Sequence, residues 1–177
     1  MKIIRLSLVV LGLSVGSLSA SAQGPARSTA SVLTAYLDVK DALVATDGDK
    51  AKAQATTLAT ALKNVKATSL SAADKKALVM AKTQATAISK TTDVDTQREA
   101  FELLSGSMIT LTKATKPARQ KARSGQSAGA VPAPTYVQFC PMAANGKGAS
   151  WLSDKKEVRN PYYGDKMLKC GSVKEEI

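Results

Sequence analysis

The sequence predicts a mainly α-helical protein: an up-down-up-down four-helix bundle followed by a small irregular C-terminal Cys/Met motif that contains a short strand. Three observations lead to this fold. Alanine and lysine are abundant and only 4% of the residues are aromatic, a composition that favours packed helices over a β-sandwich. Apolar residues recur every three or four positions in four segments. The connections between these segments are short, which favours antiparallel neighbours.

Residues 1–22 are expected to be a secretory signal peptide. Lys2 and Arg5 give a basic start, and an apolar run follows over residues 6–18. The small residues Ala20-Ser21-Ala22 form a cleavage site. Cleavage after Ala22 would deliver the protein to the periplasm. The apolar run is too short for a membrane span, and no later stretch is apolar enough, so no transmembrane segment is expected after signal removal.

Two helices are expected in the first half of the bundle region, residues 23–115. Over about residues 29–45 and again over 49–65, apolar residues recur at spacings of three and four, which places them on one helical face. Asp49 is the expected N-cap of the second helix. The inward-facing residues are Val32, Tyr36, Val39 and Leu43, then Ala51, Ala55, Leu58, Leu62 and Val65.

Capping boxes predict the starts of the third and fourth helices. Ser71 with Asp74 opens a helix that runs to about residue 90. Thr96 with Glu99 opens one that runs to about residue 113. The inward-facing residues are Leu78, Ala81, Ala85 and Ile88, then Phe101, Leu104, Met108 and Leu111. Residues 116–134 are basic and rich in proline, glycine, serine and alanine, and are expected to be a connector.

Charge and missing residue types exclude several function classes. The formal net charge is +11, and the chain has no histidine. Without histidine, the usual general base and the commonest metal ligand are missing. No Cys-x-x-Cys pair and no phosphate-binding loop occur, so we expect no enzyme. The lysines are spread over helical faces of an exported protein, which indicates a basic solvated surface rather than a nucleic-acid site.

Residues 135–177 carry the groups that are most able to do chemistry. Both cysteines lie here, each with a methionine nearby, in Cys140-Pro141-Met142 and Met167-Leu168-Lys169-Cys170. Residues 136–140 are expected to form a strand, Asn160-Pro161 with Gly164 a turn, and residues 165–170 a single helical turn that Gly171 ends. Residues two apart on a strand, or three apart on a helix, share a face. If strand and turn oppose each other, two thiolates and two thioethers meet.

Such a sulfur site has two interpretations. Thiolates and thioethers suit Cu(I) or Ag(I), and suit calcium, magnesium or manganese poorly. Lys147, Lys166 and Lys169 lie near the thiols in sequence and are expected to favour the thiolate form. The alternative is a Cys140–Cys170 disulfide, the usual outcome in an oxidising compartment. It would close a loop of about thirty residues and contribute roughly 3–4 kcal/mol.

Trp151, the single tryptophan, also has two interpretations. Its ring could cover a soft cation by a cation–π contact, or it could anchor a small satellite core in the tail. The tail is expected to pack on the bundle through its large apolar side chains, which are Phe139, Trp151, Leu152, Tyr162 and Leu168.

The tail motifs resemble those of one known family. They are Tyr136 to Ala143, Gly148 to Ser153, Asn160 to Gly164 and Met167 to Gly171, in this order and at compact spacing. The family is an uncharacterised domain from exported proteins of Gram-negative bacteria. It occurs alone or fused to periplasmic adaptor (membrane fusion) subunits of copper/silver efflux pumps. The helical region is similar too, so the resemblance covers nearly the whole mature chain.

The resemblance implies metal handling, with Cys140, Met142, Met167 and Cys170 as the ligands. It favours a stand-alone exported binder of Cu(I) or Ag(I) for metal buffering, delivery or resistance. Heavy-metal efflux components or another envelope protein would be its partner. The alternative is a disulfide-stapled helical interaction module that binds no metal.

Overall fold

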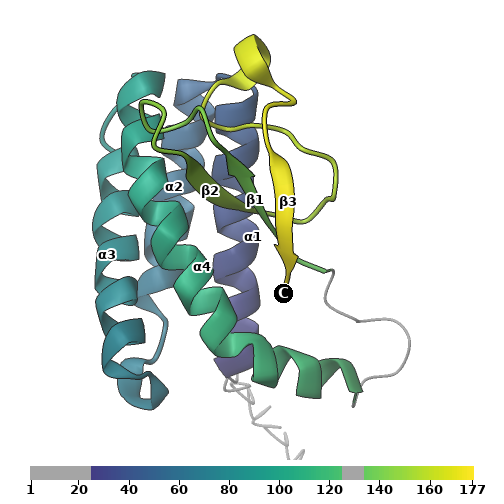
Figure 1. The fold of residues 1–177 in the computed structure, drawn as a ribbon. Helices are drawn as coiled ribbons and strands as arrows, with labels where there is room; N and C mark the ends of the chain where they lie inside the picture. Colours follow the sequence, from purple (N-terminus) through teal and green to yellow (C-terminus); the bar gives the residue numbers. More distant parts are fainter. Residues whose placement is uncertain (1–24, 125–133) are drawn as a thin grey trace, which may run out of the picture.

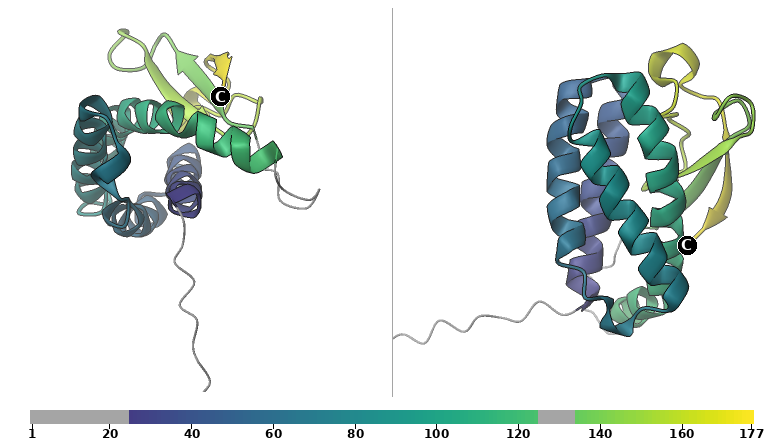
Figure 2. Two further views of the ribbon diagram at one scale, coloured as in Figure 1. Left: turned by 90° about the horizontal axis from the view of Figure 1, so that it is seen from below. Right: turned by 90° about the vertical axis from the view of Figure 1, so that its left-hand side faces the viewer.

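Four helices dominate the fold (Figure 1). The computed structural model describes residues 25–124 and 134–177. The helices are α1 (Pro25–Val44), α2 (Gly48–Lys63), α3 (Ala72–Ile88) and α4 (Val94–Ser124), with a short 3₁₀ turn, η1 (Ala67–Ser69), before α3. α1 and α3 each contact both α2 and α4, so the helices close around one core (Figure 2). The predicted mainly helical fold with four helices is confirmed, and the expected signal peptide lies outside the described residues.

Two helix starts differ from the prediction because an earlier aspartate provides the cap. Asp47, not Asp49, caps α2, and its carboxylate accepts the Lys50 N–H at 2.9 Å. α4 begins before the predicted capping box, since the Asp93 carboxylate accepts the Thr96 N–H at 2.8 Å. Aspartate before a helix satisfies one of the unpaired N–H groups of the first turn. Ser71 is confirmed as the N-cap of α3, since its hydroxyl accepts the Asp74 N–H at 3.2 Å.

The fourth helix is longer than expected. α4 continues through Ser124, so residues 116–124 are helical and not part of a connector. Alanine, arginine, glutamine and lysine occupy residues 118–123, and these are strong helix formers. α4 bends toward its C-terminal end (Figure 1), as expected of a helix that contains Pro117. The remainder of the expected connector, residues 125–133, lies outside the described part of the chain.

The C-terminal tail forms a three-stranded antiparallel sheet and is therefore more regular than the expected single strand. β1 (Tyr136–Cys140) has the predicted bounds, and β2 (Ala149–Ser153) and β3 (Ser172–Glu176) were not predicted. The strand order is β2-β1-β3. A 3₁₀ turn, η2 (Gly164–Met167), stands close to the expected helical turn. β2 packs on α4 (Figure 1).

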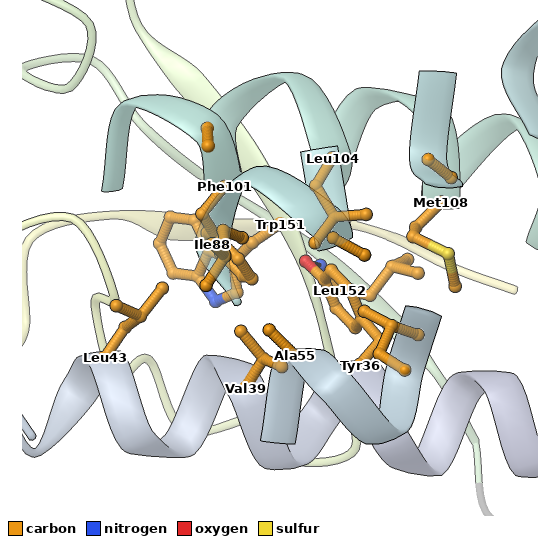
Figure 3. Packing of buried hydrophobic residues seen from close by; sticks show 14 of the residues in the cluster. Tyr36, Val39, Leu43, Ala55, Ile88, Phe101, Leu104, Met108, Trp151 and Leu152 are labelled. Atoms are coloured by element: carbon orange, nitrogen blue, oxygen red, sulfur yellow. Dashed lines mark hydrogen bonds between the residues drawn. The ribbon is translucent and has the colours of Figure 1, made fainter. Parts of the chain in front are cut away.

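One core joins the sheet to the bundle. Trp151 and Leu152 of β2 are fully buried in the same cluster as Tyr36 and Phe101 (Figure 3). The Tyr36 hydroxyl lies 2.8 Å from the Ser105 hydroxyl and accepts the Leu152 N–H at 3.1 Å. The rings of Tyr36 and Phe101 stack with centroids 5.3 Å apart. Trp151 therefore anchors the main core, and the expected satellite core is wrong.

The other three residues that were predicted to pack the tail on the bundle are buried to different degrees. Tyr162 is buried in the core, whereas Phe139 and Leu168 are only half-buried. Among the described residues, no helix is both long enough and apolar enough to cross a membrane.

Candidate functional site

The two cysteines meet where β1 ends and the chain enters β3. Cys140 is the last residue of β1 and is fully buried, whereas Cys170 is half-buried in the approach to β3. They are 30 positions apart, yet their Sγ atoms lie 2.6 Å from each other, and both are free cysteines. The pairing of β1 with β3 causes this approach. Phe139 pairs with Ser172, so the residues just beyond this pair on the two strands lie side by side.

Glycine at position 171 permits this close approach. Its φ is +137°, which is strained for any residue with a side chain. A Cβ at this position would lie 2.8 Å from the carbonyl oxygen of Phe139 and 3.0 Å from the ring of Trp151. On its other side, the Cys170 N–H donates to the Met167 carbonyl at 3.0 Å, which closes the turn after η2. The backbone on both sides of Cys170 is therefore fixed.

The two methionines occupy different surroundings. Met142 is 52% exposed and Met167 is half-buried. β1 ends at Cys140 and residues 141–147 form a turn. The strand does not continue through Pro141, so Cys140 and Met142 do not share one face of a strand. The structure brings the two thiols together; that the two methionine sulfurs complete a four-sulfur site remains a prediction.

The electrostatics favour the protonated form of Cys170. Its neighbour Cys140, together with burial, raises the pKa of the Cys170 thiol above its ordinary value of 9.0, and the Met142 N–H opposes this rise. The expectation that nearby lysines would favour the thiolate is wrong for Cys170, because Cys140 and burial shift its pKa upward. Lys147, Lys166 and Lys169 are exposed to solvent. A soft cation that binds here must displace the thiol proton.

Trp151 lies against Gly171, the residue after Cys170. The indole is fully buried and meets the ring of Tyr162 edge to face, with centroids 5.9 Å apart. Its Nε1 finds no hydrogen-bond acceptor among the described residues. The closeness of its ring to Gly171 shows that it supports the backbone next to Cys170. A role as a cation–π cover for a metal stays a prediction.

The residues that hold the two cysteine-methionine pairs in place were not predicted. Asn160 is buried, and its side-chain amide donates to the Cys170 carbonyl at 2.9 Å. The Tyr163 hydroxyl donates to the Met142 carbonyl at 2.5 Å. In the sequence, Asn160-Pro161 signals only a turn. Which carbonyls the turn reaches depends on the pairing of β1 with β3, and no local pattern reveals it.

The described residues bring no three or more Cys, Asp or Glu side chains together as a candidate metal cluster. The cysteine pair alone therefore supplies two anionic ligands when ionised. Thioethers such as those of the two nearby methionines are neutral donors of the kind that suits a soft ion.

The fold and the site define a class: a four-helix protein whose C-terminal sheet carries a dithiol. A family model described as "Protein of unknown function (DUF3347)" matches residues 32–120. The match covers about half of the chain, and the protein belongs to this family. The matched residues end within α4, before the sheet and both cysteines. No curated protein and no solved structure matches the chain.

Proposed function

We propose that the dithiol form of this protein binds one soft monovalent cation, Cu(I) or Ag(I), through Cys140 and Cys170, with Met142 and Met167 as further ligands. One observation carries the proposal: the Sγ atoms of Cys140 and Cys170 lie 2.6 Å apart although 30 positions separate them in sequence. Thiolate and thioether donors prefer Cu(I) over hard cations. The partly exposed Cys170 leaves the pair open to solvent on one side.

Binding requires the two sulfurs to separate. With metal–sulfur bonds of about 2.3 Å, two thiolates are roughly 3.8 Å apart on a tetrahedral ion and about 4.6 Å apart across a linear one. Cys140 is fixed at the buried end of β1, whereas Cys170 lies between η2 and β3. We therefore expect the Cys170 side chain to turn outward on its fixed backbone when the ion enters, so that its Sγ moves by about 1–2 Å, a distance that follows from the same bond lengths.

We infer further that the protein works in the periplasm as a stand-alone buffer or delivery protein. The basic and apolar N-terminal segment supports export, and the resemblance of the tail motifs supports heavy-metal efflux components or another envelope protein as the partner. We also propose that α1 to α4 run in up-down-up-down order, because the connections between them are short.

An anaerobic titration of the reduced protein with Cu(I), in competition with a chromogenic Cu(I) chelator, tests the proposed function. We expect one tightly bound ion per chain and loss of binding in the Cys140→Ser/Cys170→Ser double variant. Met142→Leu and Met167→Leu should each weaken binding. Met80→Leu, at an exposed methionine of α3, is the matched control and should not. Absence of tight binding, or equal binding by the double cysteine variant, would overturn the proposal.

A disulfide-stapled interaction module is the second candidate. One observation favours it: the sulfur separation of 2.6 Å is closer to a disulfide bond of about 2.05 Å than to the spacing across a metal ion. The test is a thiol count on protein isolated from the periplasm and denatured without reductant. No free thiol would support the staple, and two free thiols per chain would contradict it.

A further inference from the structure

Residues 160–164 connect the two halves of the sulfur site, which are the Cys140–Met142 half after β1 and the Met167–Cys170 half before β3. This segment, called the 160–164 clamp below, follows β2 and ends at Gly164, the first residue of η2. It contacts the backbone of one residue in each half by a side-chain hydrogen bond. The clamp is thus placed to set the distance between the halves.

Asn160 holds the half that contains Cys170. Its side-chain amide donates to the Cys170 carbonyl at 2.9 Å, and its backbone N–H donates to the Leu168 carbonyl at 2.8 Å. Its side-chain oxygen accepts the Tyr162 N–H at 2.8 Å. Asn160 is fully buried, so its orientation is fixed, and a lost bond here would leave a polar group unpaired.

Tyr163 holds the other half. Its hydroxyl donates to the Met142 carbonyl at 2.5 Å. The same carbonyl accepts the Gly146 N–H at 3.2 Å, which closes the turn that carries Met142. Phenol hydroxyls bound to a carbonyl fix direction as well as distance. Tyr163 therefore ties the exposed turn after Cys140 to the clamp.

The bundle fixes the clamp itself. Arg98 of α4 is buried, and its Nε donates to the Pro161 carbonyl at 3.0 Å. Gly164 ends the clamp with a φ of +57°, and a Cβ there would lie 2.9 Å from the Arg98 guanidinium and 2.4 Å from the Thr46 hydroxyl. Arg98 of α4 and the turn after α1 therefore position the clamp.

We propose that Asn160 and Tyr163 are positioning residues that hold the Cys140–Met142 half against the Cys170 half and so pre-form the sulfur site. The consequence for metal rests on the proposed function, whereas the consequence for the dithiol does not. With both halves held, the entropy of bringing the sulfurs together is already lost before a cation binds or a disulfide forms. Releasing one half lowers the effective concentration of one thiol at the other.

Two equilibrium constants test the clamp in the full chain. The first is the Cu(I) dissociation constant in chelator competition. The second is the constant for the balanced exchange of the dithiol with oxidised glutathione, which gives the protein disulfide and two reduced glutathione molecules. It reports on the cysteine pair without any metal. Both depend on the geometry of the site and are measured far below the unfolding temperature.

Tyr163→Phe removes the hydroxyl only. We expect Cu(I) binding to weaken, and the glutathione constant to fall, by roughly two- to fivefold, in the range of one lost exposed hydrogen bond. Asn160→Asp keeps the acceptor for the Tyr162 N–H and replaces the donor to Cys170 by an oxygen. Both of its constants should fall by about tenfold or more, because a carbonyl then faces an acceptor.

Tyr162→Phe is the matched control. Like Tyr163→Phe, it removes one tyrosine hydroxyl bond to a backbone carbonyl, the part-buried bond to Ser150 at 2.8 Å, but this carbonyl belongs to no ligand. It should lower thermal stability and leave both constants within about twofold of wild type. The clamp is overturned if Tyr163→Phe and Asn160→Asp keep both constants, or if Tyr162→Phe lowers them equally. If wild type binds no Cu(I), the proposed function fails and the glutathione constants alone decide on the clamp.

Discussion

Removing the Tyr36 hydroxyl should weaken the packing of the sheet on the bundle and lower the free energy of unfolding. This hydroxyl is fully buried, lies 2.8 Å from the Ser105 hydroxyl of α4, and accepts the N–H of Leu152 in β2 at 3.1 Å. It therefore joins α1, α4 and the sheet at a single oxygen. Tyr36→Phe keeps the ring and its stacking on Phe101, and removes only the oxygen.

The magnitude follows from the groups that lose their partner. The Leu152 N–H is held by β2 in the core and is left without this acceptor, which costs about 1–3 kcal/mol. The Ser105 hydroxyl can turn to a carbonyl of its own helix, so it adds little. We expect a loss of about 1–3 kcal/mol in the free energy of unfolding, a large part of the 5–15 kcal/mol that is typical of a domain.

Urea unfolding of the reduced protein, followed by Trp151 fluorescence and by far-ultraviolet circular dichroism, measures this loss. Trp151 reports the core beside β2, and circular dichroism reports the helices. Tyr163→Phe removes a hydroxyl from an exposed hydrogen bond and should cost less than about 1 kcal/mol. The reasoning is refuted if Tyr36→Phe loses no more than Tyr163→Phe.

Three further predictions concern pH and single residues. Because Cys140 and burial raise the pKa of the Cys170 thiol, Cu(I) must displace protons when it binds. The apparent affinity for Cu(I) should therefore rise with pH, by up to about 100-fold per pH unit between pH 6 and 8. Chelator competition at several pH values checks this, and an affinity that does not change with pH contradicts it. Gly171→Ala should lower the glutathione constant of the dithiol, because the new Cβ would lie 2.8 Å from the Phe139 carbonyl oxygen. Gly106 in α4 has open space around it, so Gly106→Ala should raise the free energy of unfolding by up to about 1 kcal/mol, as measured by urea unfolding. The pKa of Asp93 is lowered by its hydrogen bonds to Thr96 at the start of α4. Its contribution to stability is therefore present above the unfolded value of 3.8 and is lost as pH falls through the folded pKa. In urea unfolding, the stability difference between wild type and Asp93→Asn should be present at about pH 6 and shrink as the pH is lowered below 3.8; a difference that does not change with pH contradicts this.

The helices could be predicted because their signals are local. The spacing of Val39 and Leu43, or of Leu58 and Leu62, predicts which face of the helix is buried, and these residues are fully buried in the structure. The starts at Asp47 and Asp93 were missed because several polar residues precede each helix, and local sequence does not decide which of them turns its side chain back.

The sheet and the site depend on contacts between distant residues. β3 has five exposed residues, three of them charged, and shows no apolar alternation, so no periodic pattern marks it as a strand. Yet its pairing with β1 is what places Cys170 beside Cys140. The spacing of each cysteine and its methionine predicted that the two side chains act together. Which half of the site meets the other depends on the strand register, and the sequence of neither half predicts that register.

The family match ends before the sheet, yet the matched helices depend on the sheet for their buried polar groups. Tyr36 and Arg98 both lie within residues 32–120. The Tyr36 hydroxyl accepts the Leu152 N–H, and the Arg98 Nε donates to the Pro161 carbonyl. A chain that stops after Ser124 would leave the Arg98 donor without this acceptor and expose the Phe101 face that Trp151 and Leu152 cover. Such a chain should bind a dye for exposed apolar surface and lose its cooperative thermal transition. A sharp transition near the wild-type temperature would show instead that the bundle folds alone and only carries the dithiol sheet as an addition.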